Sequence, residues 1–343
     1  MIGDVLTSSI LFEVLRQKYP KAQLDYLINE HTYPVVKNNP FVNHFIFFTK
    51  AEVSSKKALI KLAKIVKNNQ YDVVIDVYSK FSSNLFTYFS GAKTRISKYK
   101  WYSSFIYTHK FKEAKNAKTN AGLAIENRLQ LLAPIIKNNT QIIQPKIYLT
   151  DIEIENSKQF LLKHHLNLNK PLFMISVLGS GLNKTYPHAY MSSIIDTIVE
   201  ETKAQILFNY IPNQENKAKE IVNFCKDSTK KHIFFNVFGK DLREFLAITK
   251  HCTALIGNEG GAINMAKALN VPTFSIYSPW ILKEAWNMFE DGKTHVSIHL
   301  KDVKPELYKA KNQKTIKKEA LTLYKNFLPE YITPKLKAFL VGK

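Results

Sequence analysis

Residues 256–266 read IGNEGGAINMA, a pattern typical of a strand that runs through a glycine-rich turn into a helix. A β-branched segment ends at Gly257, a polar turn with two more glycines follows, and residues 259–269 have helical spacing. Gly260 and Gly261 would let a ligand approach the backbone, with the amides of the first helical turn facing its phosphate oxygens. Glu259 would repel a phosphate, so we expect it to accept hydrogen bonds from sugar hydroxyls. On its own, the stretch is equally typical of a tight strand-to-helix turn without a ligand.

Strand-like and helix-like segments alternate along the rest of the chain. Apolar runs predict strands at residues 24–28, 45–48, 71–76, 171–178, 205–209, 233–237, 254–256 and 273–277. Helical spacing is found at residues 9–19, 57–67, 125–132, 190–201, 213–226, 242–250 and 259–269. This alternation predicts an α/β fold of parallel sheets with helices on both faces. Ligands of such sheets bind beyond the carboxyl ends of the strands.

Length and patterning predict how the chain is divided. The 343 residues are enough for two domains, which we place at residues 1–157 and 171–313, joined by a linker at 158–170. Residues 314–343 read as a basic helical tail interrupted by Pro329 and Pro334. No apolar run has the length of a membrane-spanning helix and no signal sequence is evident, which favours a cytoplasmic protein. The two cysteines lack metal-ligand spacing, so we expect free thiols, with a disulfide as the alternative.

The net charge of +21 is concentrated in the first half of the chain. Residues 93–118 hold eight basic residues and one acidic residue, interleaved with Tyr99, Trp101, Tyr102, Phe105 and Tyr107. Such a surface attracts an anionic partner, for which nucleic acid, an anionic lipid and a phosphorylated glycolipid are all candidates. A lysine-rich solvated face without a partner is the remaining alternative.

A second candidate segment is residues 179–187, GSGLNKTYP, which follows a predicted buried strand. Lys184 could stabilise the charge of a departing diphosphate without a metal ion. The segment is neither a Walker A motif nor a dinucleotide fingerprint. A solvated surface lysine is the alternative interpretation of Lys184.

A third candidate segment is residues 2–9, IGDVLTSS, which leads directly into a predicted helix. Asp4 could cap that helix, which is a common role for aspartate. A carboxylate that faces a cleft could instead act as a general base toward an acceptor hydroxyl. The local sequence supports both interpretations equally.

The order of these segments resembles glycosyltransferase family 9, the family of lipopolysaccharide core heptosyltransferases. Residues 3–7 (GDVLT), with a helix that ends at Tyr19 and Pro20, are similar to the family's opening, and residues 125–132 (IENRLQLL) to its mid-chain helix. KTYP at residues 184–187 resembles its Lys-x-Trp-Pro segment. GNEGGAINMAKAL at residues 257–269, with VPT at 271–273 and YSP at 277–279, resembles its most specific signature.

This resemblance implies the GT-B fold, in which two Rossmann-like domains face each other across a central cleft. It implies transfer of heptose from ADP-heptose to a lipopolysaccharide or lipooligosaccharide core acceptor, with inversion and without a metal ion or other cofactor. The partners would be the nucleotide sugar, an anionic glycolipid and the inner-membrane surface, where the enzyme would be peripheral; nucleic acid is not expected.

The resemblance also implies roles for individual residues. Asp4 matches the catalytic base, and Lys184 matches the lysine that contacts the donor phosphates. The remaining donor-binding residues would be Ser180, Glu215, Glu259, Gly260, Gly261 and Asn264. We expect the acceptor phosphates to bind Lys93, Arg95, Lys98, Lys100 and Arg128.

Several positions depart from the family pattern. Glu259 replaces an aspartate, Gly260 a serine or threonine, Asn264 a histidine and Tyr186 a tryptophan, and these changes could alter which sugar is accepted. The family begins with a strand before its Gly-Asp pair, whereas this first strand is missing here. We therefore expect the full gene product to carry a short β-branched segment before Met1.

Two other classes of function remain open. A sugar-nucleotide epimerase can share the GT-B fold, but it would not need a basic acceptor face. A non-enzymatic binder of nucleic acid or anionic membrane would account for the charge alone, and would bind no sugar nucleotide. A transferase of a different nucleotide-linked sugar is a further alternative.

Overall fold

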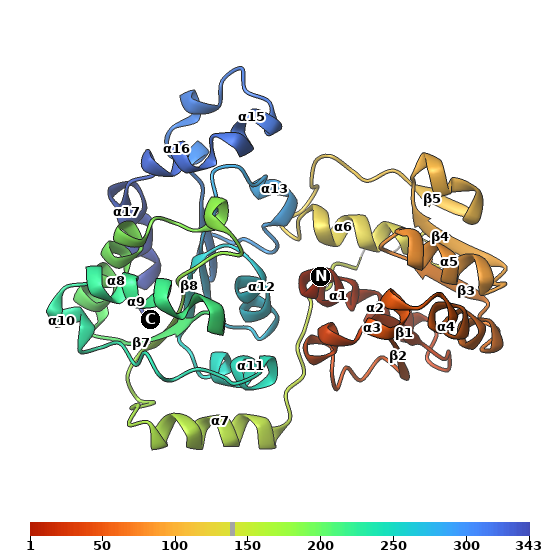
Figure 1. Cartoon of the computed structure of the whole chain (residues 1–343), viewed down its shortest axis with the longest axis horizontal. Helices are drawn as coiled ribbons and strands as arrows, with labels where there is room; N and C mark the ends of the chain where they lie inside the picture. Colours follow the sequence, from red (N-terminus) through yellow and green to blue (C-terminus); the bar gives the residue numbers. More distant parts are fainter. Residues whose placement is uncertain (138–140) are drawn as a thin grey trace. The chain divides into compact units, whose positions relative to one another are not determined.

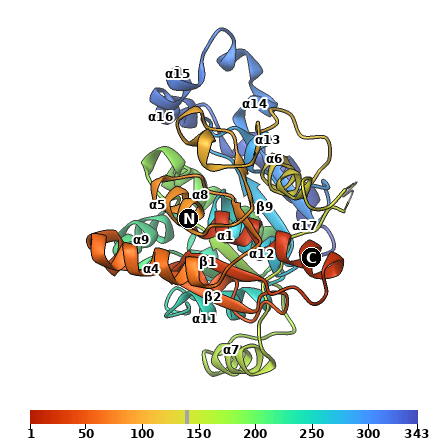
Figure 2. The ribbon, with the colours of Figure 1, turned by 90° about the vertical axis from the view of Figure 1, so that its right-hand side faces the viewer.

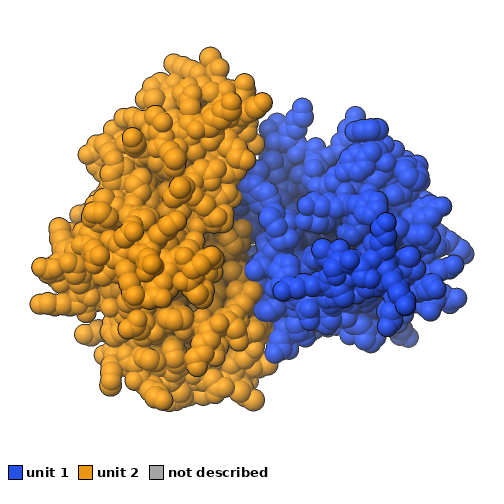
Figure 3. All heavy atoms as spheres, viewed as in Figure 1, with its two compact units in different colours: residues 1–146, 284–288 blue, residues 147–283, 289–343 orange. Residues whose placement is uncertain are grey.

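The computed structural model describes residues 1–137 and 141–343, which form two compact units. Unit 1 comprises residues 1–146 and 284–288, and unit 2 comprises residues 147–283 and 289–343 (Figure 3). The boundary differs from the predicted one, because α7 (Asp151–Lys163) extends into the predicted linker and packs on α11 (Leu242–Lys250). An ion pair of 2.6 Å between Arg243 and Glu153 joins these two helices, so residues 147–157 belong to the second unit.

Unit 2 is built on one parallel sheet of five strands, in the order β7-β6-β8-β9-β10. The strands are β6 (Leu172–Ser176), β7 (Gln205–Asn209), β8 (Ala254–Asn258), β9 (Thr273–Ile276) and β10 (His295–Ile298). All residues of β6, β8, β9 and β10 are buried, which explains the mainly apolar sequences of β6 and β8, whereas β9 and β10 also bury polar side chains. The direction in which the chain adds strands reverses between β6 and β8.

Helices cover this sheet and carry much of its core. The helices of unit 2 besides α7 and α11 are α8 (His188–Thr202), α9 (Glu215–Phe224), α10 (Asp227–Lys230), α12 (Gly261–Ala268) and α14 (Leu300–Val303), with 3-10 turns η4 (Leu182–Lys184), η5 (Pro212–Gln214) and η6 (Pro305–Tyr308). The backbones of β6 and β8 lie very close together at Gly257. A Cβ on Gly257 would lie 2.5 Å from the Ser176 carbonyl oxygen, and Gly257 has a φ of +126°, so both the space and the conformation require glycine.

The C-terminal tail is helical, and it is part of the unit 2 core. It forms α15 (Gln313–Lys318), α16 (Ala320–Lys325) and α17 (Pro329–Leu340), and α17 packs beside α8 (Figure 1). Pro329 starts α17, where its missing N–H would be unpaired in any case. Pro334 lies inside the same helix, so the prediction that it interrupts the tail is wrong. Its missing N–H removes one helix hydrogen bond, in the second turn of α17.

Unit 1 contains two separate parallel sheets. One pairs β1 (Asp25–Asn29) with β2 (His44–Phe48), which lie side by side in both views (Figures 1 and 2). The other has the order β3-β4-β5, with β3 (Val73–Asp76), β4 (Thr94–Lys98) and β5 (His109–Phe111). Within the described residues no strand precedes β1, in line with the missing first strand, and β1 and β3 are not paired with each other.

Helices and short turns surround these two sheets. They are α1 (Ile2–Ser8), α2 (Ile10–Lys18), η1 (Glu30–Val35), α3 (Lys50–Ser54), α4 (Lys56–Asn68), α5 (Phe81–Phe89), η2 (Trp101–Ile106), α6 (Leu123–Leu129) and η3 (Gln130–Leu132); α13 (Lys283–Trp286) lies at the boundary of the units. Within the described ranges, no helix combines the length and the apolarity needed to cross a bilayer. Both cysteines are buried and free, as predicted.

Several elements differ from the sequence-based prediction. The strand expected at residues 233–237 is reduced to one bridge between Ile233 and Ile206. The chain turns away there, and Phe235 stacks on Tyr210 with ring centroids 5.2 Å apart. The prediction also missed β4, β5, β10 and α5 altogether.

Candidate functional site

In unit 2, two loops leave the sheet side by side at the carboxyl ends of β6 and β8. Ser176 is in register with Gly257, so the segment after β6 and the turn after β8 begin next to each other. The strand order reverses between these two strands, which is where open α/β sheets form a crevice for ligands. The predicted donor segments therefore lie at the position where the topology favours a ligand.

A buried asparagine joins these two loops. The Asn258 side chain donates a hydrogen bond of 2.9 Å to the Ser176 carbonyl and accepts one of 2.7 Å from the Tyr186 amide. Tyr186 is itself buried, and its hydroxyl donates to the Phe327 carbonyl at 2.6 Å, so the tail helps to hold the loop. Sequence reasoning missed Asn258, although an amide side chain at the end of a buried strand was a signal that it needed a partner.

The loop after β6 folds tightly upon itself. A Cβ at Gly179 would lie 2.1 Å from the Lys184 carbonyl oxygen, so only glycine fits there. The Thr185 hydroxyl accepts from the Gly179 amide at 3.1 Å and donates to the Gly181 carbonyl at 2.9 Å. This geometry fixes the backbone on which Lys184 stands.

Lys184 and Glu259 form the central charged pair of this site. Their Nζ and Oε1 atoms are 3.7 Å apart, and the side chains are 30% and 10% exposed. Burial raises the pKa of Glu259, and the nearby Lys184 opposes this effect only in part. At 3.7 Å the contact is longer than a hydrogen bond, and Oε1 has no hydrogen-bond partner among the described residues. This buried oxygen therefore has an unused capacity to accept a hydrogen bond.

An indole ring also contacts Lys184. The Lys184 ammonium lies 5.5 Å from the centre of the Trp280 ring, and Lys317 of the tail lies 4.8 Å from the same centre. Trp280 Nε1 and the Ser278 hydroxyl both donate to the Asn183 carbonyl, at 2.8 and 2.6 Å. Sequence reasoning missed Trp280, because nothing in its local sequence indicates that it reaches a loop 97 residues earlier.

Few atoms surround the backbone at the start of α12. Gly260 has φ +153°, and a Cβ there would meet no atom within 4 Å. A Cβ at Gly261 would meet only the Met265 methyl group, at 3.9 Å. No side chain caps the helix, so its first amides are left for another acceptor. Asn264 is half-buried one turn further along the helix.

The other predicted donor residues lie at the same edge of the sheet. Ser180 is exposed in the loop after β6. Glu215 starts α9 after β7, and it forms an ion pair of 2.6 Å with Lys219. Gln214 donates to the Gly179 carbonyl at 3.0 Å, which joins the turn before Glu215 to the glycine loop. The structure thus brings Lys184 and Glu259 into contact, and places Ser180 and Glu215 in neighbouring loops.

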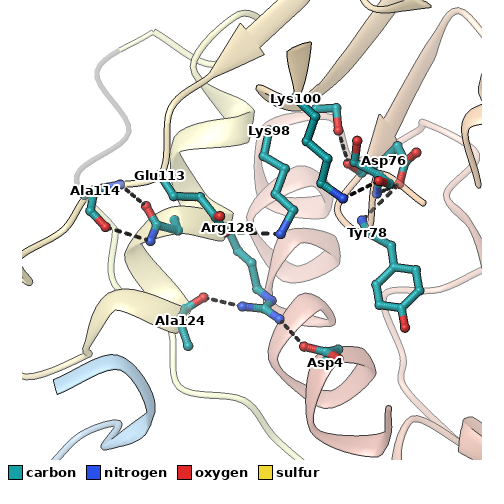
Figure 4. Close-up of polar contacts among 12 residues, drawn as sticks. Asp4, Asp76, Tyr78, Lys98, Lys100, Glu113, Ala114, Ala124 and Arg128 are labelled. Carbon is teal, nitrogen blue, oxygen red and sulfur yellow. Dashed lines mark hydrogen bonds and ion pairs between the residues drawn. The ribbon is translucent and has the colours of Figure 1, made fainter. Parts of the chain in front are cut away.

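In unit 1, Asp4 forms an ion pair with Arg128 of α6 (Figure 4). The Arg128 Nη2 atom lies 3.1 Å from Asp4 Oδ1, and the same guanidinium donates to the Ala124 carbonyl at 2.6 Å and to the Ser8 hydroxyl at 3.0 Å. Burial lowers the pKa of Arg128, and Asp4 counteracts part of that effect. Asp4 lies in the first turn of α1 and makes no capping hydrogen bond, so the interpretation of Asp4 as a helix cap is wrong.

Two of the predicted acceptor lysines lie at the carboxyl end of β4. Lys98 is 3.3 Å from Glu113, and Lys100 donates to the Ser79 carbonyl; Figure 4 shows both lysines in the same region as Arg128. The loop that carries Ser79 is fixed by Asp76, whose Oδ1 accepts from the Ser79 amide at 2.7 Å. These residues form a basic region next to Asp4.

The other two predicted acceptor residues lie at the opposite end of the same strand. Lys93 is exposed before β4, and Arg95 donates to the Ile106 and Ala92 carbonyls, each at 2.6 Å. A strand of five residues separates its ends by about 13 Å. The structure therefore does not bring Lys93 and Arg95 together with Lys98, Lys100 and Arg128.

Sequence reasoning missed a further cation near Asp4. Lys80 donates to the Tyr78 hydroxyl at 2.9 Å, and this bond raises the pKa of Lys80, with a smaller contribution from the Asp4 carboxylate. Ser8 was also missed: its hydroxyl donates to the Asp4 carbonyl at 2.6 Å while accepting from Arg128. Among the described residues, no group of three or more His, Cys, Asp or Glu side chains could hold a metal ion.

Comparisons with known proteins agree on one family. The family described as glycosyltransferase family 9 (heptosyltransferase) matches residues 59–316. Lipooligosaccharide heptosyltransferase 2 of Haemophilus ducreyi is 25% identical over 290 residues, which cover 81% of both chains. The glycosyl transferase family 9 structure from Veillonella parvula superposes with a TM-score of 0.79 at 16% identity, covering 100% of this chain and 95% of that chain. E. coli ADP-heptose lps heptosyltransferase II superposes with a TM-score of 0.73 at 17% identity, covering 99% and 96%.

Proposed function

The chain belongs to glycosyltransferase family 9, and from that premise we propose that it transfers heptose from ADP-heptose to a lipopolysaccharide or lipooligosaccharide core acceptor. The family and the GT-B fold of the structural relatives make the protein a glycosyltransferase. The proposed donor follows the name of one structural relative, which includes ADP-heptose. The proposed acceptor follows the name of a sequence relative, which includes lipooligosaccharide. Donor, acceptor and stereochemistry are the proposed part.

The Lys184–Glu259 pair beside the open start of α12 carries this proposal. A nucleotide sugar combines a diphosphate with sugar hydroxyls, and the site offers matching groups for both. We propose that Lys184 and the amides at Gly260 and Gly261 bind the diphosphate. Glu259 Oε1, which lacks a hydrogen-bond donor, then accepts from a sugar hydroxyl.

The proposed reaction is a single inverting displacement. The Asp4 carboxylate removes the proton of the acceptor hydroxyl, and the acceptor oxygen forms a bond to the anomeric carbon. The bond from that carbon to the diphosphate breaks on the opposite face, and ADP leaves with its charge stabilised by Lys184. Arg128 holds Asp4 in a fixed orientation through Oδ1. The proposal requires Asp4 and Lys184 to reach the same pair of substrates during turnover.

The basic region of unit 1 is proposed to bind the acceptor. Lys98, Lys100 and Arg128 would face the anionic groups of a core glycolipid, while Lys93 and Arg95 contribute less because they lie at the other end of β4. An acceptor of this kind is anchored in a membrane, so we propose that the enzyme works as a peripheral protein at the cytoplasmic face of the inner membrane.

A thermal-shift panel of ADP-, GDP-, UDP- and CMP-linked sugars tests the donor. A ligand at about 100 times its Kd stabilises the folded state by about 2.7 kcal/mol, which is a shift of several degrees in Tm. We expect ADP-heptose to give the largest shift. A larger shift with another sugar nucleotide would favour the second candidate, a transferase of a different sugar, for which the substitutions at Glu259, Gly260 and Asn264 are the specific reason.

The same donor then tests the reaction type. Incubation with a core acceptor should yield a glycosylated product with inverted anomeric configuration, measured by NMR. A changed sugar nucleotide that forms without any acceptor would show an epimerase and overturn the proposal.

A further inference from the structure

Helix α5 of unit 1 has its aromatic side turned to solvent. Phe81 is 81% exposed and Tyr88 and Phe89 are exposed with it, at positions i, i+7 and i+8, which share one face of a helix. The opposite face buries Phe86 together with the polar side chains of Asn84 and Thr87. Three of the four aromatic rings of the helix are thus left exposed, so the outward face is suited to a partner other than water.

The turn η2 extends this apolar side. Trp101 and Phe105 are 80% and 77% exposed, and Tyr102 is also exposed. We call the six side chains of Phe81, Tyr88, Phe89, Trp101, Tyr102 and Phe105 the aromatic face. Because η2 packs against α5, its members belong to one region of unit 1.

Buried polar contacts hold the two elements of the aromatic face in place. The Tyr107 hydroxyl, directly after η2, donates to Asn84 of α5 at 2.6 Å. It also contacts the Asp76 carboxylate at 2.6 Å, and Ser103 of η2 lies 3.5 Å from Ser79. The exposure of the aromatic rings is therefore a property of an ordered platform.

The segment that carries the aromatic face has charges of one sign only. Residues 77–112 include seven lysines and arginines and no aspartate or glutamate. Lys80 lies over the Tyr78 ring at 4.4 Å, and Lys100 lies 5.7 Å from the centre of the Tyr102 ring. Aromatic rings flanked by lysines match the interfacial region of an anionic bilayer, where the rings enter the headgroup layer and the ammonium groups meet phosphates.

We propose that the aromatic face inserts into the surface of an anionic phospholipid bilayer. Phenylalanine side chains without a polar atom favour a lipid surface over a hydrated protein partner, and the absence of acidic residues gives charge complementarity with anionic headgroups. The inference deepens the proposed function, because it names the surface by which the enzyme would meet the membrane.

Vesicle binding tests the inference directly. The full chain is mixed with phosphatidylglycerol–phosphatidylethanolamine vesicles, and bound protein is measured by sedimentation without any sugar nucleotide. The triple variant Phe81→Ser/Trp101→Ser/Phe105→Ser should bind at least tenfold more weakly, because about 1.4 kcal/mol of lost insertion energy already gives that factor. The matched control Val53→Ser/Ile152→Ser/Leu321→Ser removes exposed apolar side chains elsewhere and should bind like the wild type.

Tryptophan fluorescence gives an independent measurement. The chain has three tryptophans, and insertion of Trp101 should shift the emission to shorter wavelength with phosphatidylglycerol vesicles but not with pure phosphatidylcholine. The Trp101→Phe variant should lose this shift and keep most of the binding. Retention of the shift would mean that Trp101 does not enter the lipid.

Other outcomes would overturn the inference. These are equal vesicle binding by the triple variant, a dimer in light scattering that the triple variant abolishes without vesicle binding, or tighter binding of a single-stranded oligonucleotide through the same side chains. A thermal melt of the triple variant establishes that it is folded. Transfer to a deacylated acceptor should be unchanged in that variant, which separates failure of membrane binding from failure of the proposed transfer.

Discussion

The Asp4 carboxylate lies 3.1 Å from the Arg128 guanidinium, although the two residues are 124 positions apart in the chain. Arg128 is largely buried, so it is desolvated and depends on Asp4 and on the Ala124 carbonyl for compensation. The ion pair with Arg128 is compatible with two roles for Asp4. Asp4 could simply stabilise the fold by neutralising Arg128. It could also act as a general base, because the ion pair fixes one carboxylate oxygen and thereby orients the other.

Substitution of Asp4 by asparagine separates these two roles. Asn keeps an oxygen for Arg128 but cannot take up a proton, so kcat should fall by roughly 10²–10⁴-fold. Isothermal titration should show unchanged donor binding, and a thermal melt should show a folded protein. Asp72→Asn, which changes an exposed acid elsewhere in the same unit, should stay within about threefold of wild type. Near-normal turnover in Asp4→Asn would remove Asp4 from the mechanism.

Lys184 is expected to act on the departing diphosphate. Lys184→Ala removes the positive charge that Glu259 and Trp280 position, so kcat should fall by about 10²–10³-fold. Lys184→Arg keeps the charge and should recover part of the rate. Lys317→Ala is the matched control, because Lys317 also lies over the Trp280 ring but outside the glycine loop. Equal losses in the two alanine variants would assign the effect to the surface charge in general.

Two glycines of the same stretch should respond to alanine in opposite ways. At Gly257 a Cβ would collide with the Ser176 carbonyl at 2.5 Å, so Gly257→Ala should destabilise unit 2 by more than about 3 kcal/mol. At Gly261 the space is open, and Gly261→Ala should leave the free energy of unfolding within about 1 kcal/mol of wild type. Donor affinity of Gly261→Ala should nevertheless drop about tenfold, because the methyl group occupies the path of the diphosphate. Wild-type affinity in a folded Gly261→Ala protein would contradict donor binding there.

We expect the Glu259 carboxylate to destabilise the folded protein at neutral pH and to strengthen donor binding. Its pKa is raised by burial, so its ionised form is disfavoured in the folded protein. The stabilising contribution is present below the ordinary pKa of 4.5 and is lost as pH rises through the folded value. Glu259→Gln should therefore raise Tm at neutral pH, by an amount that shrinks in acid. Donor affinity should fall by about 10–100-fold, since a hydrogen bond to a charged group is lost. A lower Tm at neutral pH would refute the first expectation.

The donor side of the site could be predicted from sequence because its signals are local. Lys184 and Glu259 each follow a buried apolar strand, and parallel strands end at one edge of the sheet. Trp280 and Asn258 could not be assigned in the same way. Their roles depend on reaching across to other loops, through the Asn183 carbonyl and the Tyr186 amide.

Unit 1 was harder to predict, because the sequence shows which residues are charged but not where the fold places their side chains. Residues 93–118 read as one basic surface, but β4 sends Lys93 and Lys98 to opposite ends of a strand. Helix α5 was missed because three of its four aromatic residues are exposed while Asn84 and Thr87 are buried beside Phe86, which obscures the usual amphipathic pattern. The predicted strand at 233–237 failed for another reason: its apolar side chains pack as aromatic pairs beside β7 and make only one bridge.

His295 should set the acid stability of unit 2. It is buried, with Nδ1 3.1 Å from the Thr273 hydroxyl, and burial together with Lys267 lowers the pKa of His295 to about 4. The unfolded chain takes up a proton near the ordinary value of 6.5, whereas the folded protein does so only near 4. Stability is therefore full above the unfolded value and is lost as pH falls through this window, by up to about 3 kcal/mol. His295→Gln should flatten the loss, measured by urea unfolding at about pH 7 and about pH 5. The exposed His31, changed to glutamine, should leave the wild-type slope intact, and an equal slope in His295→Gln would assign the acid sensitivity to other groups.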